Sequence, residues 1–565
     1  MQPRGGGESP DGTARPPEAE PWSDRTCGQS LARAARRWPS MQAMLIDSES
    51  LSFEALWAEV RQTAAGLRRL GLKRGDHFAV CMGNGRQWCT LFLAAGTIGA
   101  VTVPINTRFK ADELAYCLRQ ADVRMLAIAD RFLSIDFIAM LRSIAPGIDS
   151  ALPCEALPLL HTVIVDGQDV PAACVPIEQL GEPCAISIDE HSEGVSADDT
   201  LLIQYTSGTT AYPKGAMLSH ASMVRDAFEV GRRLDLRPGD RYFSGRPLFH
   251  AAGTTMSLLC SIEAGACYLT TPSFDTERVL DIMERERCTH TSGNDTMFLM
   301  MMSHPSFPQR RLSLRAGWAA ATESVMRQII ERMGITGLCS AFGMSECAPN
   351  AAMAPVDDDL EARVRGFARP LPGVSIRIRS SESGLDLPAG QVGEILVRGW
   401  NVMKGYYNMP EQTAATINAE GWLQTGDLGV CDSEGRLAFV GRLKDSFRVG
   451  GENVAPAEVE DVLHRHPGIR QAQVVGVPDP RLVEVGAAYL ILQPGAQLTE
   501  SEVIAWCRER CANFKVPRYV RFIDSFEHIG MTASAKIQKR KLREFVVRDL
   551  GLDKVVLTGK DAPRV

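Results

Sequence analysis

A hydroxyl-rich loop at 205–215 is the sequence feature that most constrains the fold. The loop follows the apolar run Leu201–Ile203 and places Lys214 between Pro213 and Gly215. Its other polar groups surround Gly208 and are Thr206, Ser207, Thr209 and Thr210. Hydroxyls and backbone N–H groups on a turn suit phosphate oxygens, and the lysine adds a positive charge. Because the next segment has helical character, we predict a strand–loop–helix unit, the context of phosphate-binding loops.

Short apolar segments alternate with helical ones along the first part of the chain. Leu56, Val60, Ala64 and Leu67 recur at helical spacing, and this helix is expected to end near Gly71. The predicted strands are Phe78–Met82, Ala100–Val103, Met125–Ala129, Thr162–Val165, Cys267–Thr271 and Thr289–Ser292. This alternation predicts α/β layers with mostly parallel strands.

The pattern changes beyond about residue 390, where turns rich in Gly, Pro and Asp separate the strands. These strands are Val392–Arg398, Leu437–Val440, Gln473–Val477 and Ala487–Leu492. A chain of 565 residues is too long for one core, so two or three domains are expected. We predict a large α/β domain at 27–440, a boundary at 441–446 and a small α+β domain at 447–550; the family resemblance given below implies several subdomains in the first and makes the boundary a hinge. A disordered leader at 1–26 and a tail at 551–565 are expected to flank them.

The composition is that of an ordinary globular protein and argues against general nucleic-acid binding. Lys and Arg number 61 against 68 Asp and Glu, a net charge of −7. The 15 cysteines include no Cys-x-x-Cys pair, which favours free thiols in a reducing compartment. The uncharged run Trp88–Thr107 is interrupted by Gly and Pro, so it predicts a buried helix and strand instead of a membrane span. Since residues 1–26 lack the apolar stretch of a signal peptide, we expect a cytoplasmic protein.

Two segments carry a carboxylate beside a glycine turn. In Ala341–Glu346, the turn allows Glu346 to reach a phosphate-bound Mg²⁺, which prefers oxygen ligands. Read alone, Glu346 is more simply a surface glutamate. In Gly421–Asp427, the carboxylate of Asp427 can accept both hydroxyls of a ribose. An Asx turn that caps a hairpin is the alternative for Asp427.

Two basic segments follow. Gly441–Glu460 carries Arg442, Lys444 and Arg448 before the pair Gly450–Gly451, which suits polyphosphate oxygens and close backbone approach to a ligand. A charged interdomain turn is the alternative. Met531–Arg543 presents Lys536 on a small-residue loop, and Lys536 is the predicted reagent of this segment. The residues expected to form a solvated helix face after it are Lys539, Arg540, Lys541 and Arg543.

Together these segments resemble the adenylate-forming (AMP-binding) superfamily of acyl-CoA synthetases, luciferases and peptide-synthetase adenylation domains. The resemblance runs from about residue 30 to 545. It implies ATP, Mg²⁺ and CoA as reaction partners, and a mobile C-terminal domain that swings about Asp445. The positions that match the family's ATP-binding residues are Thr206, Ser207, Gly208, Thr209, Thr210, Lys214, Gly215, Gly317, Phe342, Gly343, Met344, Ser345, Asp427 and Arg442.

The resemblance also implies individual roles. Lys536 matches the catalytic lysine that bridges the α-phosphate and the attacking carboxylate, and Lys214 matches the lysine of the phosphate loop. Glu346 matches the Mg²⁺ ligand. Gly450 and Gly451 match the turn near the pantetheine of CoA in a second conformation. No carrier-protein serine motif follows, so a free thiol is the expected acceptor.

The substrate follows from other segments. Asn401–Asn408, Cys511–Pro517 and Met531–Arg543 resemble medium- and long-chain fatty acyl-CoA synthetases. Amino-acid-activating relatives place an aspartate near 246–253, where this chain has His250 and small apolar residues. A buried ammonium group without a counter-charge is strongly unfavourable, so a non-amino carboxylate is expected. The resemblance assigns His250, Trp318 and Met297 to the acyl pocket, although core packing is the simpler role for Met297.

Three positions depart from the family pattern. Ala211 and Ala535 stand where glycine is usual, and Trp318 fills a place usually held by a small residue. None of them removes a reacting group. We therefore expect a fatty acid–CoA ligase; the alternatives are a ligase for aryl or other bulky acids and a weakly catalytic nucleotide-binding relative.

Overall fold

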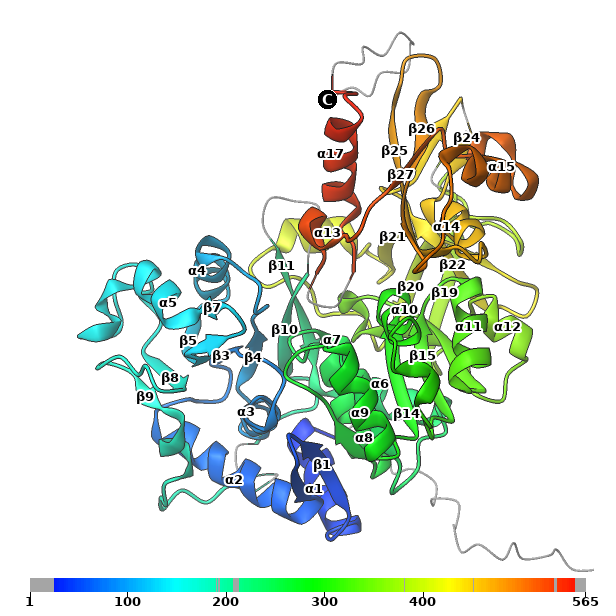
Figure 1. Ribbon diagram of the computed structural model, residues 1–565. Coiled ribbons are helices and arrows are strands. Elements are labelled where there is room, and N and C mark those ends of the chain that lie inside the picture. The colour runs from blue at the N-terminus through cyan, green and yellow to red at the C-terminus, as the bar shows by residue number, and fades with distance from the viewer. Residues whose placement is uncertain are drawn as a thin grey trace, which may run out of the picture.

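A large sheet-rich domain and a smaller C-terminal domain make up the protein in the computed structural model (Figure 1). The structure describes residues 25–189, 191, 194–206, 213–380, 382–450, 452–532 and 536–553. The last two residues assigned to the predicted leader make defined contacts: Arg25 pairs with Glu263, and Thr26 caps the first helix.

The first sheet of the large domain has seven strands, and only its outermost pair β11–β10 is antiparallel. In spatial order the strands are β11 (Lys214–Ser219), β10 (Thr200–Thr206), β4 (Val101–Pro104), β3 (His77–Cys81), β5 (Val123–Ala129), β8 (Thr162–Asp166) and β9 (Val175–Pro176). Helix α3 (Arg86–Thr97) and β4 account for the uncharged run at 88–107, as predicted. Almost all side chains of α3 and β4 are buried. A strand that is covered on both faces needs apolar residues along its whole length, which explains the uncharged sequence.

The second sheet has thirteen strands and combines a parallel half with an antiparallel half. Its parallel strands are β1 (Gln42–Ile46), β13 (Cys267–Leu269), β12 (Arg241–Ser244), β14 (His290–Asn294), β15 (Ala316–Ala320) and β16 (Gly337–Gly343). The antiparallel strands are β2 (Glu49–Ser52), β17 (Asn350–Met353), β18 (Phe367–Pro370), β19 (Val374–Arg379), β20 (Gly393–Gly399), β21 (Leu423–Cys431) and β22 (Leu437–Arg442). A separate hairpin joins β6 (Arg131–Phe132) to β7 (Ile135–Asp136).

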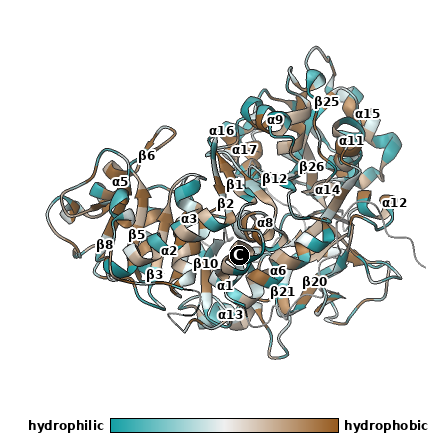
Figure 2. Cartoon of the chain, turned by 90° about the horizontal axis from the view of Figure 1, so that it is seen from below, coloured by the Kyte–Doolittle hydropathy of each residue, from teal (hydrophilic) through white to brown (hydrophobic). Residues whose placement is uncertain are grey.

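Helices surround both sheets of the large domain. The longer ones are α1 (Cys27–Arg37), α2 (Phe53–Arg69), α4 (Ala111–Gln120), α5 (Phe137–Ile144), α6 (His220–Arg233), α9 (Thr276–Arg285), α10 (Asp295–Met302) and α11 (Glu323–Met333). Shorter ones are α7 (Ala251–Gly253), α8 (Cys260–Ala264), α12 (Leu360–Val364) and α13 (Pro410–Thr416). In Figure 2, hydrophobic residues follow the strands, and hydrophilic ones lie on peripheral helices and loops. None of the helices within the described residues is long and apolar enough to cross a membrane.

The small domain is α+β, as predicted. Its sheet contains β23 (Phe447–Val449), β24 (Glu452–Val454), β25 (Ile469–Asp479), β26 (Val483–Leu492) and β27 (Tyr519–Phe522). Its helices are α14 (Pro456–His464), α15 (Glu500–Arg510), α16 (Glu527–Gly530) and α17 (Lys539–Asp549). Because β22 ends at Arg442 and β23 begins at Phe447, the hinge predicted at 441–446 coincides with the turn between the two sheets. Movement about this turn remains a prediction.

Contacts between the domains hold the small domain over one edge of the large sheet (Figure 1). The side chain of Asp461 accepts a hydrogen bond from the backbone N–H of Ser324, 3.0 Å away, in the first turn of α11. The Gln471 amide meets the Thr296 hydroxyl at 3.5 Å, next to the start of α10. These contacts place the loop before α17 close to the carboxyl ends of the parallel strands.

The prediction of a solvated face on α17 is wrong for the first residue of the helix, Lys539. Lys539 is half-buried, pairs with Glu460 and donates to the carbonyl of Val474 at 3.0 Å. Arg540 and Arg543 instead form exposed pairs with Glu544 and Glu484. In sequence, Lys539 cannot be distinguished from the basic residues beside it. In the structure, its contacts with Glu460 and Val474 anchor α17 to the sheet.

Candidate active site

The hydroxyl-rich loop joins two antiparallel strands, so the predicted strand–loop–helix unit is wrong. Lys214 and Gly215 already belong to β11, and Thr206 of β10 faces Lys214 across the pair. Gly215, Ala216 and Leu218 of β11 are buried, and a β-carbon on Gly215 would lie 2.6 Å from Ile203. Helix α6 begins only at His220. The loop residues Ser207, Gly208, Thr209, Thr210 and Ala211 lie outside the described residues.

Glu346 and Lys214 meet at one tyrosine. The hydroxyl of Tyr406 donates to the carboxylate of Glu346 at 2.8 Å, and Glu346 is 6% exposed. The ammonium group of Lys214 lies 4.3 Å from the centre of the Tyr406 ring, a cation–π contact. The surface-glutamate interpretation of Glu346 is therefore wrong. Tyr406 was not predicted as a site residue, although it lies in the segment 401–408 that carried the family likeness.

Phe342, four residues before Glu346, belongs to a stacked aromatic pair that is termed the aromatic slot. Phe342 ends the buried part of β16 and stacks on Phe439 of β22, with ring centres 6.1 Å apart. Gly343 follows, where a β-carbon would come within 2.1 Å of the Pro349 carbonyl. Gly317 of β15 is equally restricted, because a β-carbon would lie 2.0 Å from the carbonyl of Thr291. Met344 and Ser345 lead from the slot to Glu346.

Asp427 and Arg442 face each other across β21 and β22, with the guanidinium 3.6 Å from the carboxylate. Desolvation raises the pKa of Asp427 to about 6, while Arg442 and Lys536 act in the opposite direction. The Asx-turn alternative does not describe this carboxylate, which lies within a paired strand and is 8% exposed.

Lys536 reaches the same region from the small domain. Desolvation and the charge of Arg442 lower its pKa to about 8, against the opposing effects of Asp427, Asp295 and Asp445. The side chain keeps an exposed surface, so water screens part of this effect. Its backbone N–H donates to the Thr532 hydroxyl at 2.9 Å, which fixes the loop before α17. Ala535 lies outside the described residues.

His250 lies within the electrostatic influence of Lys536. Burial, together with the charges of Arg246 and Lys536, lowers the pKa of His250 to about 4, so the ring is neutral at pH 7. The indole N–H of Trp318 donates to the hydroxyl of Tyr242 at 3.0 Å. Met297 is 2% exposed and lies next to Gly245, where a β-carbon would be 3.2 Å from its methyl group.

These groups gather because parallel strands end at a common edge. Ser244 pairs with Ser292, and Ser292 pairs with Trp318, so β12, β14 and β15 end side by side. Arg246 and His250 follow β12, and Asp295 follows β14. Sequence reasoning missed Arg246, although it begins the segment singled out for His250, and it missed Asp295.

The predicted hinge and CoA turn lie farther along the chain. The backbone N–H of Asp445 donates to the carbonyl of Arg442 at 3.1 Å. Gly450 is exposed, has φ +56° and donates to the carbonyl of Leu482 at 3.0 Å. A left-handed backbone of this kind favours glycine. Gly451 lies outside the described residues.

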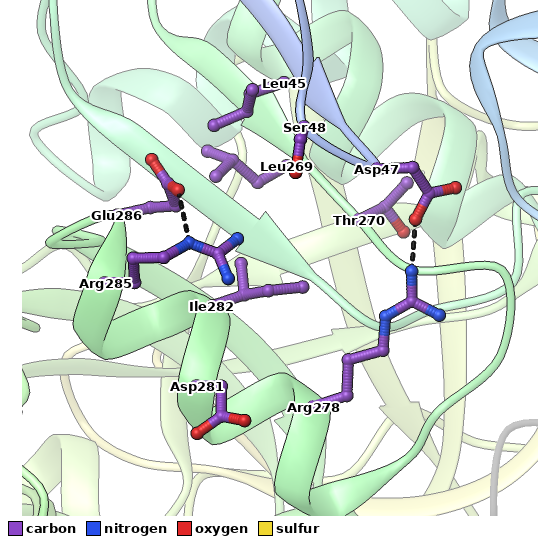
Figure 3. Close-up of a pocket in the computed structure, with 10 residues that line it drawn as sticks. All are labelled: Leu45, Asp47, Ser48, Leu269, Thr270, Arg278, Asp281, Ile282, Arg285 and Glu286. Atoms are coloured by element: carbon purple, nitrogen blue, oxygen red, sulfur yellow. Dashed lines mark hydrogen bonds and ion pairs between the residues drawn. The ribbon is translucent and has the colours of Figure 1, made fainter.

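A separate surface pocket lies between β1, β13 and α9 (Figure 3). Its charged side chains are paired with one another: Arg278 with Asp47, and Arg285 with Glu286. None of the predicted site residues lines this pocket, so it is not the candidate active site.

The pKa of Asp427 leads to a testable prediction about ATP binding. A carboxylate accepts hydrogen bonds only, whereas its protonated form turns one acceptor into a donor. We expect the affinity for ATP to fall as the pH decreases through about 6, where Asp427 takes up a proton. Calorimetric titration across this range measures the effect, and Asp427→Asn should remove this pH step. A step that persists in Asp427→Asn would contradict the assignment.

Comparison with known proteins identifies the family of this chain. The family model of the AMP-binding enzyme matches residues 31–407, and that of the AMP-binding enzyme C-terminal domain matches residues 458–536. Fold and sequence together define an adenylate-forming enzyme. The chain belongs to the AMP-binding enzyme family.

Its relatives are named as CoA ligases. The mitochondrial medium-chain acyl-CoA ligase ACSF2 of Rattus norvegicus is 33% identical over 548 residues, which cover 94% of this chain and 89% of the relative. A Rhodococcus jostii 3-[(3aS,4S,7aS)-7a-methyl-1,5-dioxo-octahydro-1H-inden-4-yl]propanoyl:CoA ligase is 36% identical over 528 residues, 92% of this chain and 98% of the relative. The crystal structure of the anthranilate CoA ligase AuaEII with anthranoyl-AMP matches with a TM-score of 0.83 and 25% identity, covering 94% of this chain and 98% of that one.

Proposed function

We propose that this protein joins a non-amino carboxylic acid, a medium- or long-chain fatty acid, to CoA through an acyl-AMP intermediate. The observation that carries this proposal is the position of Lys536. A lysine of the small domain lies in one electrostatic neighbourhood with Asp427, Arg442 and His250 of the large domain. The small domain thus adds a cation to a site whose other groups belong to the large domain. We place this cation between the nucleotide and the acid.

The first half-reaction is attack of the substrate carboxylate on the α-phosphorus of ATP, which releases pyrophosphate. Adenine fits the slot at Phe342, and Asp427 accepts the ribose hydroxyls beside Arg442. Lys214 and Lys536 offset the negative charge that builds up on the phosphates. Lys536 is the bridging cation because it acts on both Asp427 and His250.

Glu346 is suited to hold Mg²⁺ together with the phosphates. Its carboxylate is a hard oxygen ligand, buried and oriented by Tyr406. The described residues contain no cluster of three or more metal-ligating side chains, which agrees with an ion held mainly by nucleotide and water. When bound, the ion neutralises phosphate charge.

The second half-reaction transfers the acyl group to the thiol of CoA and releases AMP. We propose that the small domain turns about Asp445, which withdraws Lys536 and brings the Gly450–Gly451 turn to the site. The turn between β22 and β23 supports this hinge, since it is the direct backbone link between the two sheets.

The positive charges near His250 support a carboxylic acid substrate that has no amino group. Arg246 and Lys536 are the two charges that act on the pKa of His250, and both would repel an ammonium group. A second candidate is a ligase for bulky or ring-containing acids. It is favoured by Trp318, held against Tyr242 in the predicted acyl pocket, and by the ring-containing acids in the names of two relatives.

Carboxylate-dependent exchange of pyrophosphate into ATP tests the proposal. A panel of straight-chain acids and aryl acids separates the two ligase candidates by kcat/KM. We expect exchange with medium-chain acids, followed by acyl-CoA formation when CoA is added. ATP binding without exchange for any acid would instead support the weakly catalytic alternative.

The compartment is a separate proposal. All 15 cysteines are free in the structure, which supports a reducing environment such as the cytoplasm. Fractionation of cells that express the tagged protein tests this location.

A further inference from the structure

Arg246 holds an uncompensated positive charge inside the acid-binding region. It lies two residues beyond β12, and its guanidinium carbon is 4.1 Å from the centre of the Trp318 ring. Asn84 fixes this stretch of backbone: its amide donates to the carbonyl of Arg246 at 2.8 Å and accepts from the N–H of Leu248 at 2.7 Å. The guanidinium therefore projects from a rigid support.

The described residues give this guanidinium no anionic partner. Its Nε and Nη2 atoms are out of contact with solvent, and neither has a hydrogen-bond acceptor within the described ranges. Burial lowers the pKa of Arg246 to about 10, which leaves it fully charged at pH 7. The Trp318 ring offsets part of the charge through a cation–π contact, but supplies no acceptor oxygen. A buried cation in this state is stabilised by an anion from a ligand.

Arg246 lies among the residues of the predicted acyl pocket. Its guanidinium contacts Trp318, and its neighbour Gly245 lies against the methyl group of Met297. Lys536 marks the end of the acid where the reacting carboxylate is proposed to bind. These contacts with Trp318 and Met297 assign Arg246 to the acyl portion of the substrate.

We propose that Arg246 binds a second oxygen-bearing group on the substrate, so that the preferred acid is a dicarboxylic acid. This inference rests on the proposed function and names the substrate class of that site. The planar guanidinium binds a carboxylate through two parallel N–H···O bonds. Trp318 covers one face of the group, so a distal carboxylate would bind in its plane, where Nε and Nη2 have no acceptor among the described residues. Arg246 is thus a specificity-determining residue.

Matched pairs of substrates test the proposal. Straight-chain monocarboxylic acids and the dicarboxylic acids of equal carbon number are compared by ATP–pyrophosphate exchange in wild type, Arg246→Met, Arg246→Lys and the surface control Arg232→Met. We expect the wild type to prefer the diacid at one chain length at least. Arg246→Met should lower kcat/KM for that diacid about 100-fold and leave the monoacid nearly unchanged, because only the diacid loses a partner. Arg246→Lys, which keeps charge without the planar fork, should lie between them.

Other outcomes would overturn the proposal. A wild-type preference for the monoacid at every length excludes a distal carboxylate site. Equal losses for monoacid and diacid in Arg246→Met would place the arginine at the reacting carboxylate or in a structural role. Calorimetric binding of the diacid separates the two proposals: Arg246-dependent binding without exchange upholds this inference and refutes the ligase function. The Arg246→Lys variant and the wild-type preference still decide the question if Arg246→Met does not fold.

Discussion

Replacing Lys536 by alanine is expected to lower carboxylate-dependent ATP–pyrophosphate exchange about 100- to 1,000-fold, the effect of removing one preorganised charge from a transition state. The lysine is the cation that the small domain contributes to the group around Asp427, Arg442 and His250. ATP binding should change little, since the adenine slot and Asp427 belong to the large domain. Loss of rate with retained binding identifies a group that acts mainly in the transition state.

Lys541→Ala is the matched control. Lys541 is exposed on α17, five positions beyond Lys536 in the same basic segment. Its removal changes the net charge equally, so it tests whether total charge alone matters. Exchange at the wild-type rate in Lys536→Ala would refute the role given to this lysine. Lys536→Ala is expected to affect the rate of the thiolation step differently, because this step follows the proposed domain rotation, after Lys536 has left the site.

Replacing Glu346 by glutamine is expected to lower exchange activity about 100-fold at low Mg²⁺ and to raise the Mg²⁺ concentration that gives half-maximal rate. The substitution removes the negative charge but keeps the size of a side chain that is only 6% exposed. Tyr406→Phe should have a smaller effect, about tenfold, because it removes only the 2.8 Å hydrogen bond that orients the carboxylate. Magnesium titrations of the exchange rate measure both effects.

Glu411→Gln provides the control for the loss of a carboxylate. Glu411 is exposed on α13, close in sequence to Tyr406 but outside the site. We expect the Mg²⁺ dependence of exchange in Glu411→Gln to match that of the wild type. An unchanged Mg²⁺ requirement in Glu346→Gln would contradict the proposed metal ligand.

Most of the fold could be predicted from local patterns. The apolar runs at 78–82, 125–129 and 162–165 became β3, β5 and β8, because strands buried on both faces need apolar residues throughout. The helical spacing from Leu56 to Leu67 became α2, which ends at Arg69. The change of pattern beyond residue 390 comes late, because the antiparallel half of the second sheet begins with β17 at Asn350.

The errors have a common physical cause. Lys214–Ser219 lacks the alternation of buried and exposed residues that would distinguish it from the start of a helix, and only pairing with β10 makes it a strand. Lys539 differs from its basic neighbours only through Glu460, a residue 79 positions away. Both depend on partners that are remote in sequence, where local propensity carries no information.

The sequence by itself determined the family and predicted the reacting groups, because their chemistry depends on residue type and order; the predicted groups are Lys214, Glu346, Asp427, Arg442 and Lys536. Tertiary structure alone decided which of them meet and which charges remain uncompensated. Tyr406 joins Glu346 to Lys214, and Arg246 has no anionic partner beside Trp318 within the described part of the chain. The reason is that burial and electrostatic pairing are properties of distances in space, which chain folding sets between residues far apart in sequence.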